Sequence, residues 1–199
     1  MLGMDVQCSG EAVRTYFERL RLLLADVPEA QVERVVDMLL KARIDGRRVY
    51  VVGNGGSAST AAHLVCDLQK SATVTGAAPI RAIGLVDSAA LMTAWANDFS
   101  YEQVFAGQIT ALVEPDDIVI AISASGNSPN ILAALRAATA RHAQTVAFVG
   151  FDGGIARQLA DVAVHIPCHD YGLVEDVHSA LGHAITAAIR EVLTNETAS

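Results

Sequence analysis

The stretch "VVGNGGSASTAAHLVCDLQK" (51–70) sets the architecture because it joins a strand, a glycine turn and a helix. A β-branched strand is expected over 47–53 and a helix over 57–70. The turn between them contains Gly53, Asn54, Gly55, Gly56, Ser57 and Ala58. Its glycines let a ligand approach the backbone, and the helix that follows offers free N–H groups and the positive end of its dipole. The turn therefore predicts an anion site.

The same alternation of strand and helix continues to the end of the chain. Further strands are expected at 80–86, 117–123, 144–150 and 161–167, and helices at 89–97, 101–113, 129–141 and 173–194. Two amphipathic helices, 10–25 and 29–44, come first as a helical hairpin. This order predicts an α/β protein with a doubly wound parallel sheet of about five strands, covered by helices on both faces. Ligands of such sheets bind at the carboxyl ends of the strands.

A second turn of the same kind follows the expected strand at 117–123. The segment "ISASGNSPN" (122–130) gathers the hydroxyls of Ser123, Ser125 and Ser128 just before a helix that begins near a proline. Hydroxyls and backbone amides at a helix start hold a phosphate monoester by hydrogen bonds and the helix dipole. One such turn is also an ordinary helix cap. Two of them, at strand-to-helix junctions of one sheet, favour a phosphate site.

Two nucleotide-binding alternatives fit the first turn less well. Gly53, Gly55 and Ala58 match the dinucleotide pattern G-x-G-x-x-[GA], which also needs an acidic residue about 20 positions on. Asp87 lies about 30 positions on, at the start of a helix. The nucleoside triphosphate loop G-x-x-x-x-G-K-[ST] is absent from the sequence.

Composition limits the partners that we expect. Of the 199 residues, 52% are hydrophobic and 18% charged, and the net charge is −8. No apolar run is long enough for a membrane span, no basic cluster suggests nucleic acid, and the N-terminus lacks a signal-peptide pattern. Cys8, Cys66 and Cys168 form no CxxC pair, which favours a reducing cytoplasm. The apolar composition favours a homo-oligomer over a monomer.

Histidines and carboxylates occur at helical spacing on two expected helices. His63 and Asp67 are four apart and share a face, and Glu175 and His183 are eight apart and can share one. Together they could bind a divalent metal or act as a general acid and base. Each residue taken alone is more often a surface or capping residue. Asp176 and His178 are expected to be structural or to support the site.

Four segments resemble the sugar isomerase (SIS) domain proteins, and in particular the phosphoheptose isomerases. They are "GNGGSAS" (53–59), "AWANDFSYEQVFAGQI" (94–109), "ISASGNSPNIL" (122–132) and "EDVHSALGHAI" (175–185). The resemblance implies a flavodoxin-like sheet in a homotetramer with sites at subunit interfaces. It also implies an aldose–ketose isomerase that converts sedoheptulose 7-phosphate to heptose 7-phosphate through an enediol. The expected domain is 1–199, with helices in 1–45 used in oligomerisation and a phosphosugar-binding core over 46–199.

The resemblance also implies roles for individual residues. The implied substrate contacts are Asn54, Gly55, Gly56, Ser57, Asp98, Ser123, Ala124, Ser125, Ser128 and Glu175. The implied ligands of a zinc ion, or of another divalent metal, are His63, Asp67, Glu175 and His183. Asp67 is the implied base and His183 the implied acid.

The sequence departs from the family pattern at four positions. Asp67 stands where the family has glutamate, and Glu175 stands where it has glutamine. Ser71 lies near the position of an arginine in the family's substrate pocket, and Ala124 replaces a threonine. Shortening the base by one methylene displaces the carboxylate by about 1 Å, which can lower a rate on the order of 100-fold. The alternative function is a non-catalytic scaffold that resembles the SIS-domain proteins associated with a replication initiator.

Overall fold

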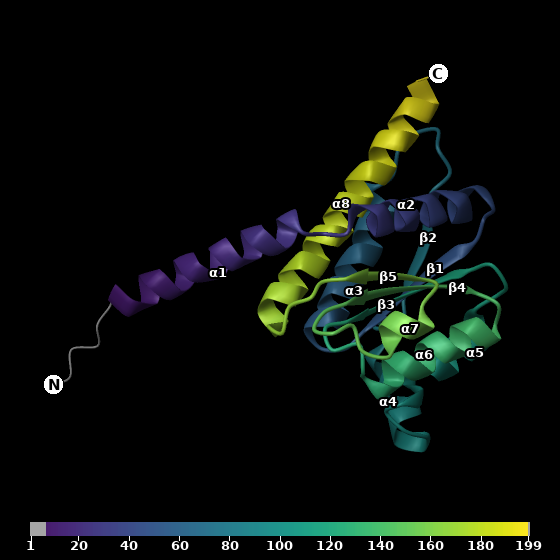
Figure 1. Ribbon diagram of the computed structural model, residues 1–199. Coiled ribbons are helices and arrows are strands. Elements are labelled where there is room, and N and C mark those ends of the chain that lie inside the picture. Colours follow the sequence, from purple (N-terminus) through teal and green to yellow (C-terminus); the bar gives the residue numbers. More distant parts are fainter. Residues whose placement is uncertain (1–6, 199) are drawn as a thin grey trace.

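A parallel sheet of five strands forms the centre of the computed structural model, which describes residues 7–198 (Figure 1). The strands are β1 (Arg48–Gly53), β2 (Arg81–Gly84), β3 (Ile118–Ser123), β4 (Gln144–Val149) and β5 (Val162–His165). Their order, β2-β1-β3-β4-β5, is that of flavodoxin-like folds. The predicted doubly wound α/β fold is therefore confirmed. Residues 1–6 and 199 of the expected domain lie outside the described part.

Helices cover both faces of this sheet (Figure 1). They are α1 (Gln7–Ala25), α2 (Glu29–Ile44), α3 (Gly56–Cys66), α4 (Ala89–Asp98), α5 (Gln103–Leu112), α6 (Pro129–Ala140), α7 (Ala156–Leu159) and α8 (Tyr171–Ala198). A π-helical turn, η1 (Asp67–Ser71), extends α3. None of the described helices is long and apolar enough to cross a lipid bilayer.

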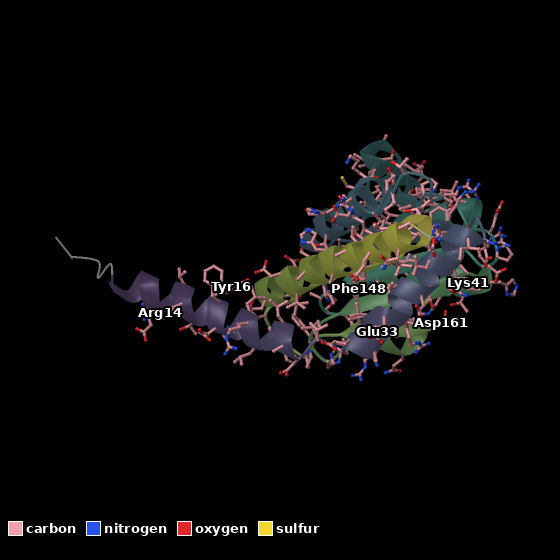
Figure 2. All side chains as sticks on the ribbon, turned by 90° about the horizontal axis from the view of Figure 1, so that it is seen from above. Arg14, Tyr16, Glu33, Lys41, Phe148 and Asp161 are labelled. Atoms are coloured by element: carbon pink, nitrogen blue, oxygen red, sulfur yellow. The ribbon has the colours of Figure 1, made fainter. Side chains whose placement is uncertain are left out.

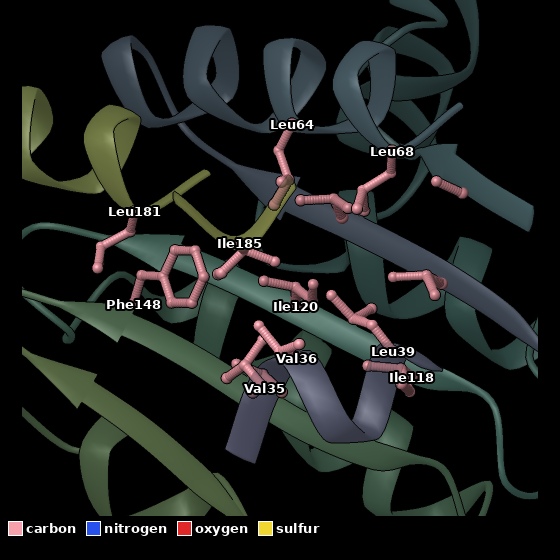
Figure 3. Close-up of a cluster of buried hydrophobic side chains, with 14 of the residues drawn as sticks. Val35, Val36, Leu39, Leu64, Leu68, Ile118, Ile120, Phe148, Leu181 and Ile185 are labelled. Carbon is pink, nitrogen blue, oxygen red and sulfur yellow. The ribbon is translucent and has the colours of Figure 1, made fainter. Parts of the chain in front are cut away.

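The alternation of side chains along each strand produces two hydrophobic cores. On one face, Ile120 and Phe148 pack with Leu64 of α3, Val36 of α2 and Ile185 of α8 (Figure 3). The opposite face carries a separate cluster, built from the other side chains of β1, β3 and β4 and from α5 and α6. Because α3 and α8 share the first core, the side chains on their outer faces are held next to each other.

Several element boundaries differ from the expected ones. The helix expected over 57–70 begins at Gly56 and changes at Asp67 to the π-helical turn, in which the N–H of Ala72 bonds to the carbonyl of Asp67 at 2.9 Å. The last helix is longer than 173–194, and α7 was not predicted because it has only four residues.

The first helix, α1, does not fold back along α2 as the expected hairpin required. It extends away from the core and contacts α8 (Figures 1 and 2). The hydroxyl of Tyr16 donates to Asp176 at 2.7 Å, which raises the pKa of Tyr16 to about 12, and Arg19 pairs with Asp170 at 3.1 Å. Apolar side chains such as Phe17, 62% exposed, remain uncovered by the chain itself.

Candidate functional site

The two glycine–serine turns lie side by side because β1 and β3 are adjacent in the sheet. Gly53, the last residue of β1, is in register with Ile122 of β3, so both turns leave the same edge. In the second turn Gly126 has φ +63°, and a Cβ there would overlap the carbonyl of Gly153. Only glycine fits this backbone position. The serine turn therefore keeps the tight path that its sequence predicts.

A reciprocal pair of amide hydrogen bonds joins the two turns. Asn54 Nδ2 donates to Asn130 Oδ1 at 2.8 Å, and Asn130 Nδ2 donates to Asn54 Oδ1 at 2.8 Å. The hydroxyl of Tyr101 also donates to Asn54 Oδ1, at 3.0 Å. Both lone pairs of this oxygen are thus used, so the amide of Asn54 can offer a ligand only an N–H donor.

A cavity of about 120 Å³ lies between the turns, and we call it the serine cradle. It is lined by Asn54, Ser57, Ile122, Ser123, Ala124, Ser125, Ser128, Tyr171 and Glu175. Ser123 and Ser125 accept hydrogen bonds from the backbone N–H groups of Gly126 and Asn127, at 3.2 and 3.3 Å. Their own O–H groups are left to donate into the cradle. Ser128 precedes α6 as its N-cap residue without a capping hydrogen bond.

Glu175 contributes the only carboxylate that lines the serine cradle in the described part of the chain. Its carboxylate lies against Gly56, the first residue of α3, where a Cβ would overlap it. A carboxylate is favoured there because the start of a helix carries a partial positive charge. The position that an anionic ligand would use is thus next to a negative side chain of the protein.

A second group of polar side chains lies farther along α3 and α8. The Nε2 atoms of His63 and His183 are 3.1 Å apart, and Asp67 Oδ2 lies 3.4 Å from the first and 3.7 Å from the second. The histidine side chains are 62% and 60% exposed, whereas that of Asp67 is 13% exposed. Ser71 Oγ donates to the other carboxylate oxygen, Asp67 Oδ1, at 3.0 Å.

The three side chains fit a divalent metal by the chemistry of their atoms. One nitrogen from each of His63 and His183 and one oxygen of Asp67 lie within 4.8 Å of one another. Imidazole nitrogen and carboxylate oxygen suit zinc, and three protein ligands leave a position open for a substrate. Glu175 does not join this group within the chain. It lies eight residues before His183 on α8, about 12 Å along the axis, at the serine cradle.

Four other residues singled out in the sequence neither line the serine cradle nor belong to the group of His63, Asp67 and His183. Asp98 is exposed at the end of α4, where it accepts a hydrogen bond from Asn97, and it does not line the serine cradle. Gly55 is exposed at the N-cap of α3. Asp176 accepts the bond from Tyr16. His178 is fully buried, and burial lowers its pKa to about 4.

Three residues near the site were not predicted from the sequence. Tyr101 and Asn130 fix the amide of Asn54, and Ser71 holds Asp67. A signal existed only for Ser71, which follows Asp67 by four residues and so shares its helix face. The contacts of Tyr101 and Asn130 join separate elements, and no spacing in the sequence reveals them.

Comparison with known proteins relates the chain to one family. Residues 15–150 match the SIS domain family. The phosphoheptose isomerase of Geotalea daltonii is 34% identical over 166 residues, which are 83% of this chain and 86% of that protein. The phosphoheptose isomerase of Shewanella denitrificans is 34% identical over 186 residues, 92% of each chain.

A solved structure has the same arrangement of elements. The phosphoheptose isomerase of Neisseria gonorrhoeae superposes with a TM-score of 0.86 at 25% identity. The superposition covers 94% of this chain and 100% of that one.

Proposed function

Because the chain belongs to the SIS domain family and, within it, to the phosphoheptose isomerases, we propose that it converts sedoheptulose 7-phosphate to heptose 7-phosphate. One observation carries this proposal. Ser57 of the serine cradle and His63 of the group with Asp67 and His183 lie at two positions along the same helix, α3. From Ser57 to His63 the helix rises about 9 Å, comparable to the length of an extended sugar phosphate.

The serine cradle is proposed to hold the phosphate group. Its hydroxyls, the N–H of Asn54 and the start of α3 all offer hydrogen to an anion. No lysine or arginine lines it among the described residues, so recognition rests on hydrogen bonds and helix dipoles. Such donors suit a phosphate monoester whose charge is shared over several oxygens.

The other end of the site is proposed to carry out the isomerisation. Asp67 takes the proton from C1 of the ketose, and the C–H electron pair forms the C1–C2 double bond of the enediol. In the site without metal, His183 gives a proton to the carbonyl oxygen at C2. The reverse transfers, with the proton returned to C2 and the O1 proton removed, yield the aldose. The base and acid roles are those that the resemblance implies for these two residues.

Zinc is the proposed metal, held by His63, Asp67 and His183. When bound, it supplies a Lewis acid for the carbonyl oxygen. The proposal departs from the expected set of four ligands, since the carboxylate of Glu175 lines the serine cradle instead. In the alternative without metal, Asp67 and His183 act alone.

We also propose that the chain assembles as a homotetramer through α1. The support is a set of exposed apolar side chains on this helix, Val13, Phe17, Leu22 and Leu24. The cytoplasm is the proposed compartment, since Cys66 is an exposed free thiol that a reducing environment preserves.

Incubation with sedoheptulose 7-phosphate in deuterium oxide tests the function. We expect an aldose product, and we expect deuterium to enter at C1 or C2 because the enediol exchanges its proton with solvent. Asp67→Asn serves as the inactive control. If the purified chain, supplied with zinc, forms no aldose and incorporates no deuterium into the sugar, the isomerase proposal fails and the result favours the scaffold alternative. That alternative is disfavoured because His63, Asp67 and His183 converge.

A further inference from the structure

Asp67 must present one carboxylate oxygen to His63 and His183 although its side chain is short. The oxygen that faces them is Oδ2, at 3.4 and 3.7 Å from their Nε2 atoms. A carboxylate can rotate about its terminal torsion, which has broad minima, so the side chain alone does not keep Oδ2 in this direction. Another group has to hold the other oxygen.

Ser71 holds that other oxygen. Its Oγ donates to Asp67 Oδ1 at 3.0 Å, and both side chains line a groove of about 540 Å³ together with His183. The hydrogen bond occupies Oδ1 and leaves Oδ2 to the two histidines. Ser71 therefore contacts the carboxylate on the side away from the histidines' nitrogen atoms.

The π-helical turn fixes where Ser71 lies. Asp67 is the first residue of η1 and Ser71 the last, and the turn closes through the bond from Ala72 N–H to the Asp67 carbonyl at 2.9 Å. Leu68 is 1% exposed and anchors the turn in the core (Figure 3), and Ala72, 2% exposed, belongs to the same buried cluster. The wider turn is thus held by packing that does not depend on a ligand.

We propose that Ser71 is a positioning residue that directs Asp67 Oδ2 toward His63 and His183. The proposal rests on the proposed function, in which this oxygen serves the metal and the reaction. It also connects two departures from the family pattern, since a short acid at 67 and a small hydroxyl at 71 contact each other. A hydroxyl in this place binds the carboxylate and leaves the groove free of a bulky side chain.

The experiment compares Ser71→Ala and Ser71→Thr with the parent chain. Thr73→Ala is the matched control, because Thr73 Oγ1 bonds to the Gln69 carbonyl at 2.8 Å in the same region without touching Asp67. Two readouts are used: steady-state kinetics on sedoheptulose 7-phosphate, and binding of Co²⁺ and Zn²⁺ to the metal-free protein by visible absorption and calorimetry. Thermal melting verifies that each variant is folded.

We expect Ser71→Ala to lower kcat by about 10- to 100-fold, since displacing a reacting group by about 1 Å has an effect of this size. KM should change little because the serine cradle is intact. The variant should also weaken Co²⁺ and Zn²⁺ binding and alter the Co²⁺ spectrum, and Ser71→Thr should restore both. In an Asp67→Glu background the longer side chain reaches farther, so adding Ser71→Ala should lower kcat by a smaller factor.

Two results overturn the inference: unchanged kcat and metal binding in Ser71→Ala, or equal losses in Thr73→Ala. Failure of the proposed function gives a different pattern. The parent chain then does not isomerise the sugar, while Ser71→Ala still weakens metal binding, and the positioning role stands. A parent chain that neither isomerises the sugar nor binds Co²⁺ or Zn²⁺ contradicts both proposals.

Discussion

His63 and His183 are 120 positions apart in the sequence, yet their Nε2 atoms lie 3.1 Å apart. The two rings come from different helices, α3 and α8, so the packing of these helices sets the distance between their nitrogens. A divalent cation satisfies both nitrogen lone pairs together with Asp67 Oδ2. This contact is the basis of the first prediction.

We predict that the purified protein carries about one zinc per chain and that His63→Ala or His183→Ala removes it, since two ligands hold a metal far more weakly than three. Elemental analysis measures the metal, and chelation followed by zinc addition should abolish and then restore isomerase activity. His142→Asn is the control, because asparagine tolerates the positive φ of 60° at this exposed position. A metal-free protein with full activity contradicts the metal role and supports the alternative with Asp67 and His183 alone.

Replacing Ser125 and Ser128 together with alanine should weaken binding of the sugar phosphate by roughly 1–3 kcal/mol, because hydrogen bonds to a charged group are lost. Both residues line the serine cradle. Calorimetry with sedoheptulose 7-phosphate in the Asp67→Asn background measures binding without turnover. Ser59→Ala, at an exposed position of α3, should bind like the parent. Equal affinity in all three proteins would rule out this phosphate site.

Removing the negative charge of Glu175 should strengthen phosphate binding. The carboxylate lies at the start of α3, where the ligand's own charge is expected, and like charges a few ångströms apart repel by about 1 kcal/mol even in water. Glu175→Gln keeps the shape and should lower the Kd for inorganic phosphate several-fold. Competition kinetics measure this value, with Glu33→Gln at an exposed position of α2 as control. Weaker binding in Glu175→Gln would instead indicate that the carboxylate accepts a hydrogen bond from the ligand.

His178 makes stability depend on pH. Burial lowers its pKa from 6.5 to about 4, so between these values the unfolded chain binds a proton that the folded chain does not. The free energy of unfolding should therefore fall as pH decreases through this window, by about 1.5 kcal/mol from pH 6.5 to pH 5, since the slope approaches 1.36 kcal/mol per pH unit only below pH 6.

The variant His178→Leu isolates this effect, because leucine fills the buried space and does not titrate. Urea unfolding of both proteins at pH 7 and pH 5 gives the comparison, and the parent should lose about 2 kcal/mol more than the variant. Identical losses would mean that His178 is protonated in the folded protein.

The exposed apolar side of α1 should join copies of the chain. Phe17→Asp places a charge in the expected interface and should reduce the mass measured by light scattering at micromolar concentration from a tetramer to a smaller species. Phe99→Asp, at a 70% exposed position after α4, should leave the mass unchanged. A monomeric parent chain, or an equal effect of the two variants, counts against assembly through α1.

Much of the fold could be predicted because its signals are local. Strand and helix periods identified all five strands and the order of elements, and glycine and serine turns marked the edge where ligands bind. The prediction that α1 and α2 form a hairpin was wrong, because the local sequence pattern does not determine which surface the apolar side of α1 packs against. The short α7 was missed because four residues carry too little periodicity.

The contacts of the candidate site also divide into those within one helix, which the sequence predicts, and those between helices, which it does not. A spacing of four residues was sufficient to bring His63 and Asp67 together, because one helix determines their relative position. Helix spacing also suggested that Glu175 and His183 share a site, but a common face does not remove an axial separation of about 12 Å. The packing of α3 beside α8 takes the two residues to different ends: Glu175 to the serine cradle, His183 to His63. By itself the sequence determined which chemical groups this protein has and the helices that carry them. Only the tertiary structure decided which groups meet, because contacts between separate elements depend on how the cores pack rather than on any spacing along the chain.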